Sequence, residues 1–107
     1  KAWKRHSRMT LNLVCVVGKI HFVLYDGREN SPTYGRFMEM TLSPKCPELY
    51  RRITIPPGVW MAFIGIADSK SVLLNIADIL HDPTEQVNIP IEESNIRFDF
   101  AKINIEK

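Results

Sequence analysis

The amino-terminal stretch of this 107-residue chain places three basic side chains at alternate positions, Lys4, His6 and Arg8. If this stretch is an extended strand, all three point to the same side of a sheet, because successive side chains alternate between faces. Burial in an apolar interior disfavours the charged form of an amine, and a neutral amine can act as a general base. The pattern therefore predicts Lys4 and His6 as candidate catalytic residues. The alternative is an exposed edge on which these groups are solvated.

Other kinds of chemistry find less support in the sequence. A metal site needs several imidazoles or carboxylates that converge, but no two of the three histidines, His6, His21 and His81, lie two residues apart. Neither Cys15 nor Cys46 has a histidine neighbour, and the G-x-S-x-G elbow and the glycine-rich phosphate motifs are missing. We therefore expect no metal, no cofactor and two free thiols, as in a reducing cytoplasm.

Composition bounds the kind of protein and its partners. A formal net charge of +2 is too small to indicate a nucleic-acid partner, and 45% hydrophobic with 24% charged residues is typical of a globular domain. No apolar run approaches the roughly 18 residues that span a bilayer, and no signal-peptide pattern begins the chain. The sequence therefore predicts a soluble cytoplasmic protein without a membrane partner. Its length fits one domain, and because the first residue is Lys1 we treat the chain as open to further terminal segments.

Short runs rich in apolar and β-branched residues follow one another along the chain and are separated by turn signals. We expect strands over residues 10–17, 19–25, 34–42, 50–55, 60–66, 71–77, 87–91 and 96–105. The first two are predicted to pair as a hairpin closed near Gly18, and the runs 60–66 and 71–77 are predicted to form the next pair. Residues 71–79 also allow a helical interpretation, which the tight bounds of the segment disfavour.

Two of these runs meet at Pro56-Pro57-Gly58, which predicts a fixed corner between two strands, because prolines do not donate to a central ladder and glycine tolerates positive φ. Many short strands with such corners indicate an all-β sandwich or barrel. We favour a double-sheet jelly roll over an immunoglobulin-like sandwich, whose cysteine and tryptophan spacing is missing. Trp60 and Met61, just after the corner, are candidates to line a ligand pocket; the alternative is that they belong to the core.

Three groups of residues occur in a fairly specific combination: Ser-Pro-Thr-Tyr-Gly-Arg at 31–36, Ile-Thr-Ile-Pro-Pro-Gly at 53–58 with Phe63, and Asp78 followed by His-Asp-Pro-Thr-Glu at 81–85. In order and spacing they resemble the nucleotide-sugar 3,5-epimerases of the cupin superfamily, of which dTDP-4-dehydrorhamnose 3,5-epimerase is the nearest type. The resemblance implies one cupin-like domain over residues 1–107, a double-stranded β-helix or jelly roll. It also implies a metal-free homodimer that inverts two carbons beside a keto group by removing and returning protons.

The resemblance implies roles for several basic and polar positions. Lys1 falls where the family has an arginine suited to a diphosphate, and it keeps the charge. Lys4 falls where the family has its histidine base, with His6 two residues further along the same face. Asn12 falls near a lysine that helps to hold the keto group. These positions are therefore expected to face a nucleotide-linked sugar.

Other positions depart from the family pattern. Met61 stands where a histidine follows the corner, and Leu74 and Leu80 stand at two tyrosine positions, the first of which supplies the acid. No carboxyl-terminal aspartate that would orient the base is recognisable. These changes imply altered or lost catalysis.

The sequence therefore predicts an epimerase-like protein that acts on or binds a dTDP-4-keto-6-deoxy sugar. The expected substrate contacts are Lys1, Asn12, Trp60, Met61 and Leu74. The alternative is a non-catalytic binding or assembly module of sugar or polysaccharide biosynthesis, with its pocket filled by Met61, Leu74 and Leu80.

Overall fold

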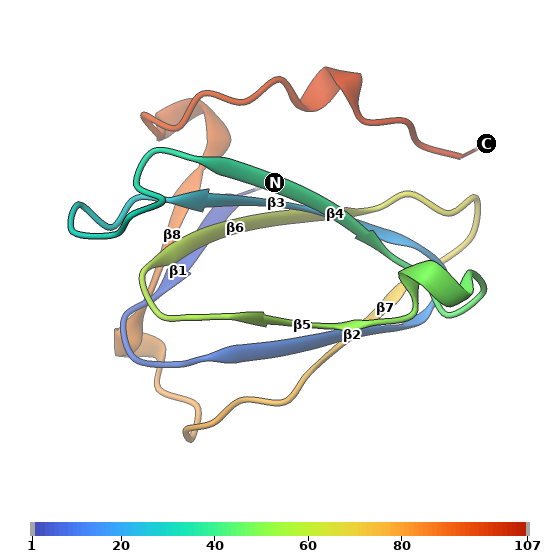
Figure 1. Ribbon diagram of the computed structural model, residues 1–107, viewed down its shortest axis with the longest axis horizontal. Coiled ribbons are helices and arrows are strands. Elements are labelled where there is room, and N and C mark those ends of the chain that lie inside the picture. Colours follow the sequence, from blue (N-terminus) through green and yellow to red (C-terminus); the bar gives the residue numbers. More distant parts are fainter. Residues whose placement is uncertain (1, 107) are drawn as a thin grey trace.

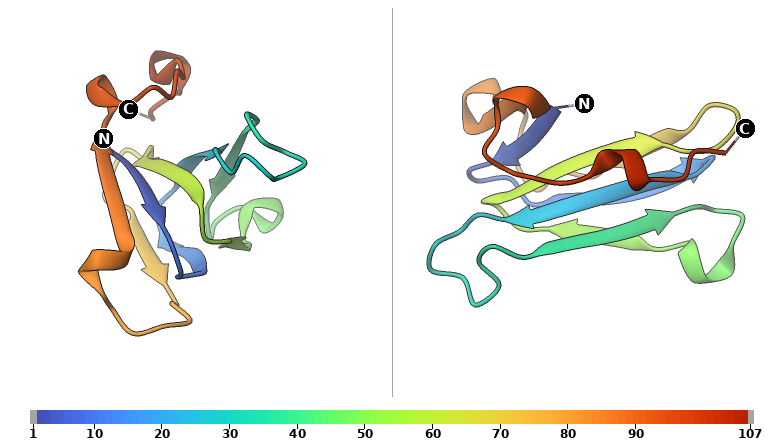
Figure 2. Two further views of the ribbon diagram at one scale, coloured as in Figure 1. Left: turned by 90° about the vertical axis from the view of Figure 1, so that its left-hand side faces the viewer. Right: turned by 90° about the horizontal axis from the view of Figure 1, so that it is seen from above.

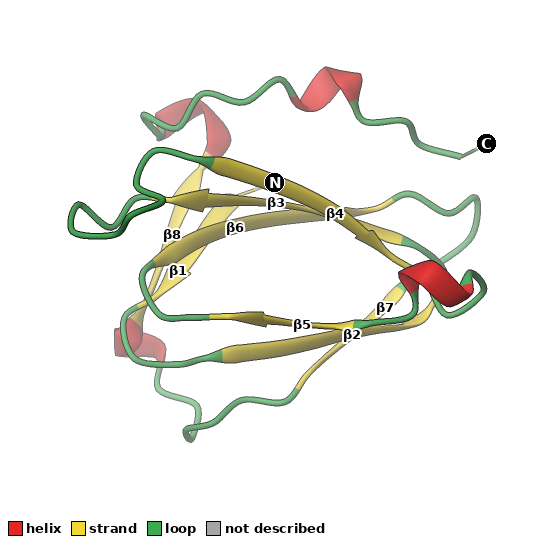
Figure 3. Cartoon of the chain, viewed as in Figure 1, coloured by secondary structure: helices red, strands yellow, loops and turns green. Residues whose placement is uncertain are grey.

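The computed structural model describes residues 2–106, in which eight strands form two antiparallel sheets packed face to face (Figure 1). The five-stranded sheet has the order β4-β3-β6-β1-β8 and consists of β1 (Ala2–His6), β3 (Ile20–Asp26), β4 (Phe37–Leu42), β6 (Val59–Gly65) and β8 (Gln86–Pro90). The three-stranded sheet has the order β5-β2-β7 and consists of β2 (Leu11–Val17), β5 (Arg52–Ile55) and β7 (Val72–Asn75). Short 3-10 helices (Figure 3) are η1 (Pro47–Leu49), η2 (Pro83–Glu85), η3 (Ile91–Glu93) and η4 (Phe100–Lys102). The predicted all-β fold is confirmed.

The main core lies between the two sheets, because alternate residues of each strand point inward. Along β2, Leu11, Leu13 and Cys15 are buried, whereas the residues between them are partly exposed. The five-stranded sheet contributes Phe22 and Met61 from its inward face. Each large apolar side chain buried here contributes about 1.5–3 kcal/mol, so this layer holds the small domain together.

A second apolar cluster lies on the outer face of the five-stranded sheet, where residues 91–106 run across it (Figure 2). Ile96, Phe98 and Phe100 all pack there, and the rings of Trp3 and Phe100 are 5.6 Å apart. The predicted strand over 96–105 is therefore wrong, although the period-two apolar pattern is real. The segment crosses the face of the sheet rather than lying beside an edge strand, so it has no ladder to join.

The predicted hairpin at Gly18 is also wrong, because the strands that flank Gly18 belong to different sheets. β2 pairs with β5 and β7, whereas β3 pairs with β4 and β6. Gly18 has a φ of +82°, and a Cβ there would lie 2.7 Å from the carbonyl oxygen of Lys70. The glycine thus sends the chain across the core instead of back along the same sheet. For the same topological reason β6 and β7 are not paired.

The corner at Pro56-Pro57-Gly58 is confirmed, since it joins β5 in one sheet to β6 in the other. Gly58 takes a φ of +90°, a conformation that L side chains rarely adopt. Residues 72–75 form a strand, in agreement with the preferred interpretation of that segment over the helical one. These crossings bring the start of β6, the end of β1 and the end of β3 to one end of the sandwich.

Candidate active site

A buried histidine and a buried carboxylate meet where β1 ends and β8 begins. His6 is the last residue of β1 and is 8% exposed, and Glu85, in η2 directly before β8, is 4% exposed. The β1–β8 ladder pairs His6 with Gln86, which brings Glu85 beside the imidazole. Nδ1 of His6 and Oε1 of Glu85 are in hydrogen-bond contact. A pair of this kind is a candidate proton-transfer unit.

The second oxygen of the Glu85 carboxylate is also committed, because Oε2 accepts the backbone N–H groups of Arg8 at 3.0 Å and Met9 at 3.1 Å. Burial raises the pKa of Glu85, but the hydrogen bonds from His6, Arg8 and Met9 together outweigh it and hold the pKa at about 2. The carboxylate is therefore ionised and accepts at every contact. His6 must then carry its hydrogen on Nδ1 when neutral, which leaves Nε2 as a proton acceptor.

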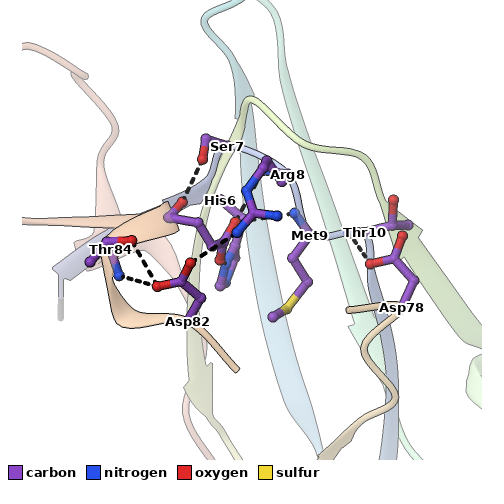
Figure 4. Close-up of polar contacts among 9 residues, drawn as sticks. His6, Ser7, Arg8, Met9, Thr10, Asp78, Asp82 and Thr84 are labelled. Carbon is purple, nitrogen blue, oxygen red and sulfur yellow. Dashed lines mark hydrogen bonds and ion pairs between the residues drawn. The ribbon is translucent and has the colours of Figure 1, made fainter. Parts of the chain in front are cut away.

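The turn that follows β1 is fixed by polar contacts with the segment before β8 (Figure 4). Ser7 donates its backbone N–H and its hydroxyl to the carbonyl oxygen of Glu85, at 2.8 and 2.9 Å. Nη2 of Arg8 lies 2.9 Å from Oδ2 of Asp82, and Oδ1 of the same carboxylate caps η2 by accepting the backbone N–H of Thr84. These contacts hold the two segments together and so position the histidine–glutamate pair.

The structure brings together two of the three basic residues expected on one face. Lys4 pairs in register with Met61, whose side chain lies in the core between the sheets, so Lys4 and His6 share the inward face of β1. Arg8 does not share it, because β1 ends at His6 and the Arg8 side chain is 59% exposed beside Asp82. The predicted alternation therefore holds for Lys4 and His6 and is wrong for Arg8.

Two of the residues expected to contact substrate lie on the outward face of the three-stranded sheet. The Asn12 amide donates to the carbonyl oxygen of Ile76 at 3.1 Å and accepts the hydroxyl of Thr54 at 2.9 Å. Leu74 is 47% exposed, and Leu80, which the alternative places inside a filled pocket, is 90% exposed. Asn12 and Leu74 are thus not gathered with His6, and neither leucine fills the interior.

The remaining substrate candidates lie in three different settings. Trp60 belongs to the apolar cluster on the outer face of the five-stranded sheet, with the Arg5 guanidinium 4.8 Å from its ring centre. Met61, the next residue, is 4% exposed on the opposite, inward face. Lys1 lies outside the described residues. Among the residues expected in the site, Lys4, His6 and Met61 therefore lie together on the inward face of the five-stranded sheet.

A cavity of about 400 Å³ opens at the same end of the sandwich. Its walls are partly apolar and partly polar, and they are formed by Leu24, Asp26, Arg28, Thr33, Arg36, Phe37, Met38, Thr54, Pro56 and Val59. The corner at Pro56-Pro57-Gly58 contacts both the cavity and β1. Pro56 lines the cavity, and the N–H of Gly58 donates to the carbonyl oxygen of His6 at 2.8 Å. Apolar walls that also carry polar groups are the usual form of a small-molecule site.

No cluster of three or more histidine, cysteine or acidic side chains that could hold a metal ion occurs within residues 2–106. In the same part of the chain, no helix has the length and apolar character needed to cross a membrane.

Sequence reasoning missed Glu85 as a partner of His6. The sequence did draw attention to both stretches, since His6 lies in the basic amino-terminal stretch and Glu85 ends the His-Asp-Pro-Thr-Glu run. Their contact depends on the pairing of β1 with β8 across 79 positions of sequence, which no local pattern reveals.

The two antiparallel sheets packed face to face define a cupin-type jelly roll, and the buried histidine–carboxylate pair lies near one end of it. The model of the family described as dTDP-4-dehydrorhamnose 3,5-epimerase matches residues 4–107, and the chain belongs to this family.

Individual relatives agree with this assignment. The chain is 34% identical over 83 residues to the probable low-salt glycan biosynthesis epimerase Agl13 of Haloferax volcanii, covering 77% of this chain and 51% of that protein. The crystal structure of a dTDP sugar isomerase from Desulfovibrio desulfuricans is 44% identical, with a TM-score of 0.90 over 98% of this chain and 66% of that one. A dTDP-4-dehydrorhamnose 3,5-epimerase from Elizabethkingia anophelis shares the fold, with 21% identity and a TM-score of 0.77 over 100% of this chain and 60% of that one. The cupin jelly roll is confirmed, and the chain spans about half the length of the Haloferax volcanii relative.

Proposed function

We propose that this chain carries the proton-transfer site of an epimerase that acts on a dTDP-4-keto-6-deoxy sugar, with His6 as the base. The hydrogen bond between His6 and the ionised Glu85 carries this proposal, because it directs Nε2 away from the carboxylate as the free acceptor. Nε2 takes a proton from a carbon beside the ketone, the C–H bond pair moves into an enolate, and Glu85 stabilises the imidazolium that forms. Water delivers a proton to the opposite face of that carbon, which inverts it, and the imidazolium of His6 releases its proton to solvent, which restores the base.

Lys4 is proposed as the cation that stabilises the enolate oxygen. It shares the inward face of β1 with His6 two residues away, and its register partner Met61 gives it an apolar neighbour. Lys4 is partly buried, and a positive charge in such a site favours a developing oxyanion more strongly than it would in water. The resemblance assigns Lys4 to the base position, but only His6 of the two has a carboxylate among its described contacts.

The cavity beside the corner is proposed to receive the part of the ligand that does not react. Its volume of about 400 Å³ and its apolar wall suit a ring system, and Arg36 adds a positive charge for a phosphate. A homodimer and a metal-free reaction, as the family resemblance implies, complete the proposal together with a cytoplasmic location and no cofactor, as the sequence predicts.

The test is proton exchange at the substrate. The protein is incubated in deuterated water with a dTDP-4-keto-6-deoxy sugar, and NMR follows deuterium incorporation at the carbons that flank the ketone. His6→Gln is expected to slow exchange by about 10²–10⁴-fold, the usual contribution of a general base. Arg5→Met is the matched control, because Arg5 lies between Lys4 and His6 on the same strand but stacks on Trp60 at the other face. Absence of exchange with the unmodified chain refutes the proposal for this substrate, and full exchange in His6→Gln removes His6 from the mechanism.

A non-catalytic binding module is the second candidate, and the burial of Met61 in the core favours it, since this side chain occupies space beside Lys4. A binding module predicts that calorimetry detects binding of the dTDP-sugar, while NMR finds no deuterium incorporated into the sugar.

A further inference from the structure

We propose that Arg28 is a positioning residue for His6 and acts on it through Gly58. This inference rests on the proposed function, because His6 is taken as the base. Arg28 lies in the loop between β3 and β4, whereas Gly58 lies at the corner between β5 and β6, so neither is near His6 in sequence.

Arg28 is fixed by the carboxylate of Asp26, the last residue of β3, which is 6% exposed. Oδ1 of Asp26 accepts from the backbone N–H of Arg28 at 3.0 Å and from its Nε at 2.9 Å, and Oδ2 accepts from its Nη2 at 3.0 Å. The hydroxyls of Ser31, at 2.6 Å, and Thr33 also donate to Oδ2. The guanidinium group and the backbone of Arg28 are therefore held by one buried anion.

The carbon chain of Arg28 lies against the backbone of Gly58. A Cβ placed on Gly58 would lie 2.9 Å from both Cγ and Cδ of Arg28, closer than real Cβ contacts come. Two features therefore favour glycine at position 58, its φ of +90° and this close approach. The stem of Arg28 limits how far the peptide of Gly58 can move toward the loop.

The peptide of Gly58 in turn holds the backbone of His6, because its N–H donates to the carbonyl oxygen of His6 at 2.8 Å. His6 is thus fixed at two points, at its carbonyl by Gly58 and at its ring by Glu85. A displacement of about 1 Å at a reacting group can cost on the order of 100-fold in rate. The contacts from Asp26 through Arg28 and Gly58 therefore set the position of the imidazole, although Arg28 touches no reacting atom.

This arrangement gives a physical reason why the Ser-Pro-Thr turn and the Pro-Pro-Gly corner occur together in the chain. The turn supplies the Ser31 and Thr33 hydroxyls that fix Asp26, and the corner supplies the glycine against which Arg28 packs. Through these contacts the turn and the corner together hold the end of β1 in place.

The experiment compares Arg28→Ala, which removes the stem, with Arg28→Lys, which keeps a stem and a charge. Arg52→Met, at an exposed arginine of β5, is the control. We expect Arg28→Ala to lower kcat for deuterium exchange by about 10-fold or more because the imidazole is displaced, and to raise KM as well, because Arg28 also lines the cavity proposed for the ligand. Arg28→Lys is expected to lie between Arg28→Ala and the unmodified chain. A folded Arg28→Ala or Arg28→Lys protein with unchanged kcat overturns the proposal.

A second readout does not depend on the reaction. NMR of the imidazole nitrogens reports the surroundings of His6 directly, and their chemical shifts are expected to change in Arg28→Ala but not in Arg52→Met. If the unmodified chain shows no exchange, the epimerase proposal fails while this readout still tests Arg28. Unchanged His6 signals in Arg28→Ala overturn the positioning role.

The double variant tests the path through the corner. Gly58→Ala places a methyl group against the Arg28 stem, so the damage to the His6 signals is expected to be smaller when Arg28→Ala is already present. Equal damage in both backgrounds means that Arg28 does not act through Gly58, and overturns the proposal.

Discussion

Two of the three positive-φ glycines, Gly18 and Gly35, allow a direct test of what holds the sheet crossing in place. Gly18 has a φ of +82° and Gly35 a φ of +84°, so alanine at either site meets nearly the same backbone penalty, about 1–2 kcal/mol. Their surroundings differ. A Cβ at Gly35 meets nothing within 4 Å, whereas one at Gly18 overlaps the Ser71 hydroxyl and lies 2.7 Å from the carbonyl oxygen of Lys70.

The extra overlap at Gly18 sets the expected size of the effect. Forcing a methyl group into a packed site costs about 1–3 kcal/mol, so Gly18→Ala should lose about 2–5 kcal/mol and Gly35→Ala about 1–2 kcal/mol. Displacement of the Ser71 hydroxyl also disturbs its bonds to the backbone of Lys19, at 3.0 and 3.1 Å. Equilibrium unfolding in urea measures both variants, and unchanged m-values confirm that stability alone has changed. Equal losses in the two variants would refute the steric argument for the crossing.

Three further outcomes follow from burial and charge. The pKa of Glu85 in the folded protein, about 2, lies below its ordinary value of 4.5. The ionised carboxylate therefore stabilises the fold fully above pH 4.5, and this stabilisation is lost as the pH falls toward 2. The midpoint of urea unfolding should drop over this pH range, and should drop less in Glu85→Gln. Burial raises the pKa of the Cys15 thiol, so at pH 8 a disulfide reagent should modify Cys46 in the native protein and Cys15 only after unfolding; equal rates contradict this. Met61→Ala should cost about 2–5 kcal/mol by urea unfolding and the half-exposed Leu74→Ala about 0.5 kcal/mol or less, and similar costs would place Leu74 in the core.

The fold could be predicted from local signals because those signals report local physics. Strand residues reveal themselves by alternation, and Pro56-Pro57-Gly58 reveals a corner because each residue type restricts its own backbone. Pairing is a different property, since it depends on which sheet a strand joins. Gly18 indicates a change of direction equally well whether the chain folds back or crosses the core, and only its contact with Ser71 and Lys70 decides. The hairpin prediction failed at this point.

The same difference between local signals and long-range structure decides which residues of the candidate site could be predicted. Lys4 and His6 could be found because they lie on one strand at alternate positions, so strand geometry alone places them on one face. Asn12 and Leu74 were expected near them because of the resemblance, but the alternation of β2 and β7 directs both side chains outward. A position that matches a family in order along the chain need not match in the face it presents. An error of one residue reverses that face.

Glu85 alone does not separate an enzyme from a binding module, because its carboxylate also satisfies the backbone of Arg8 and Met9 and so serves the fold. Lys4 separates them better. The polar contacts that hold this end of the sandwich involve Ser7, Arg8 and Glu85 rather than Lys4, so Lys4→Met should leave the urea midpoint nearly unchanged. If Lys4 stabilises an enolate, the same variant should lose deuterium exchange by about 100-fold or more, as when one oxyanion donor is removed. A Lys4→Met protein that retains both stability and exchange would show that Lys4 takes no part in the reaction.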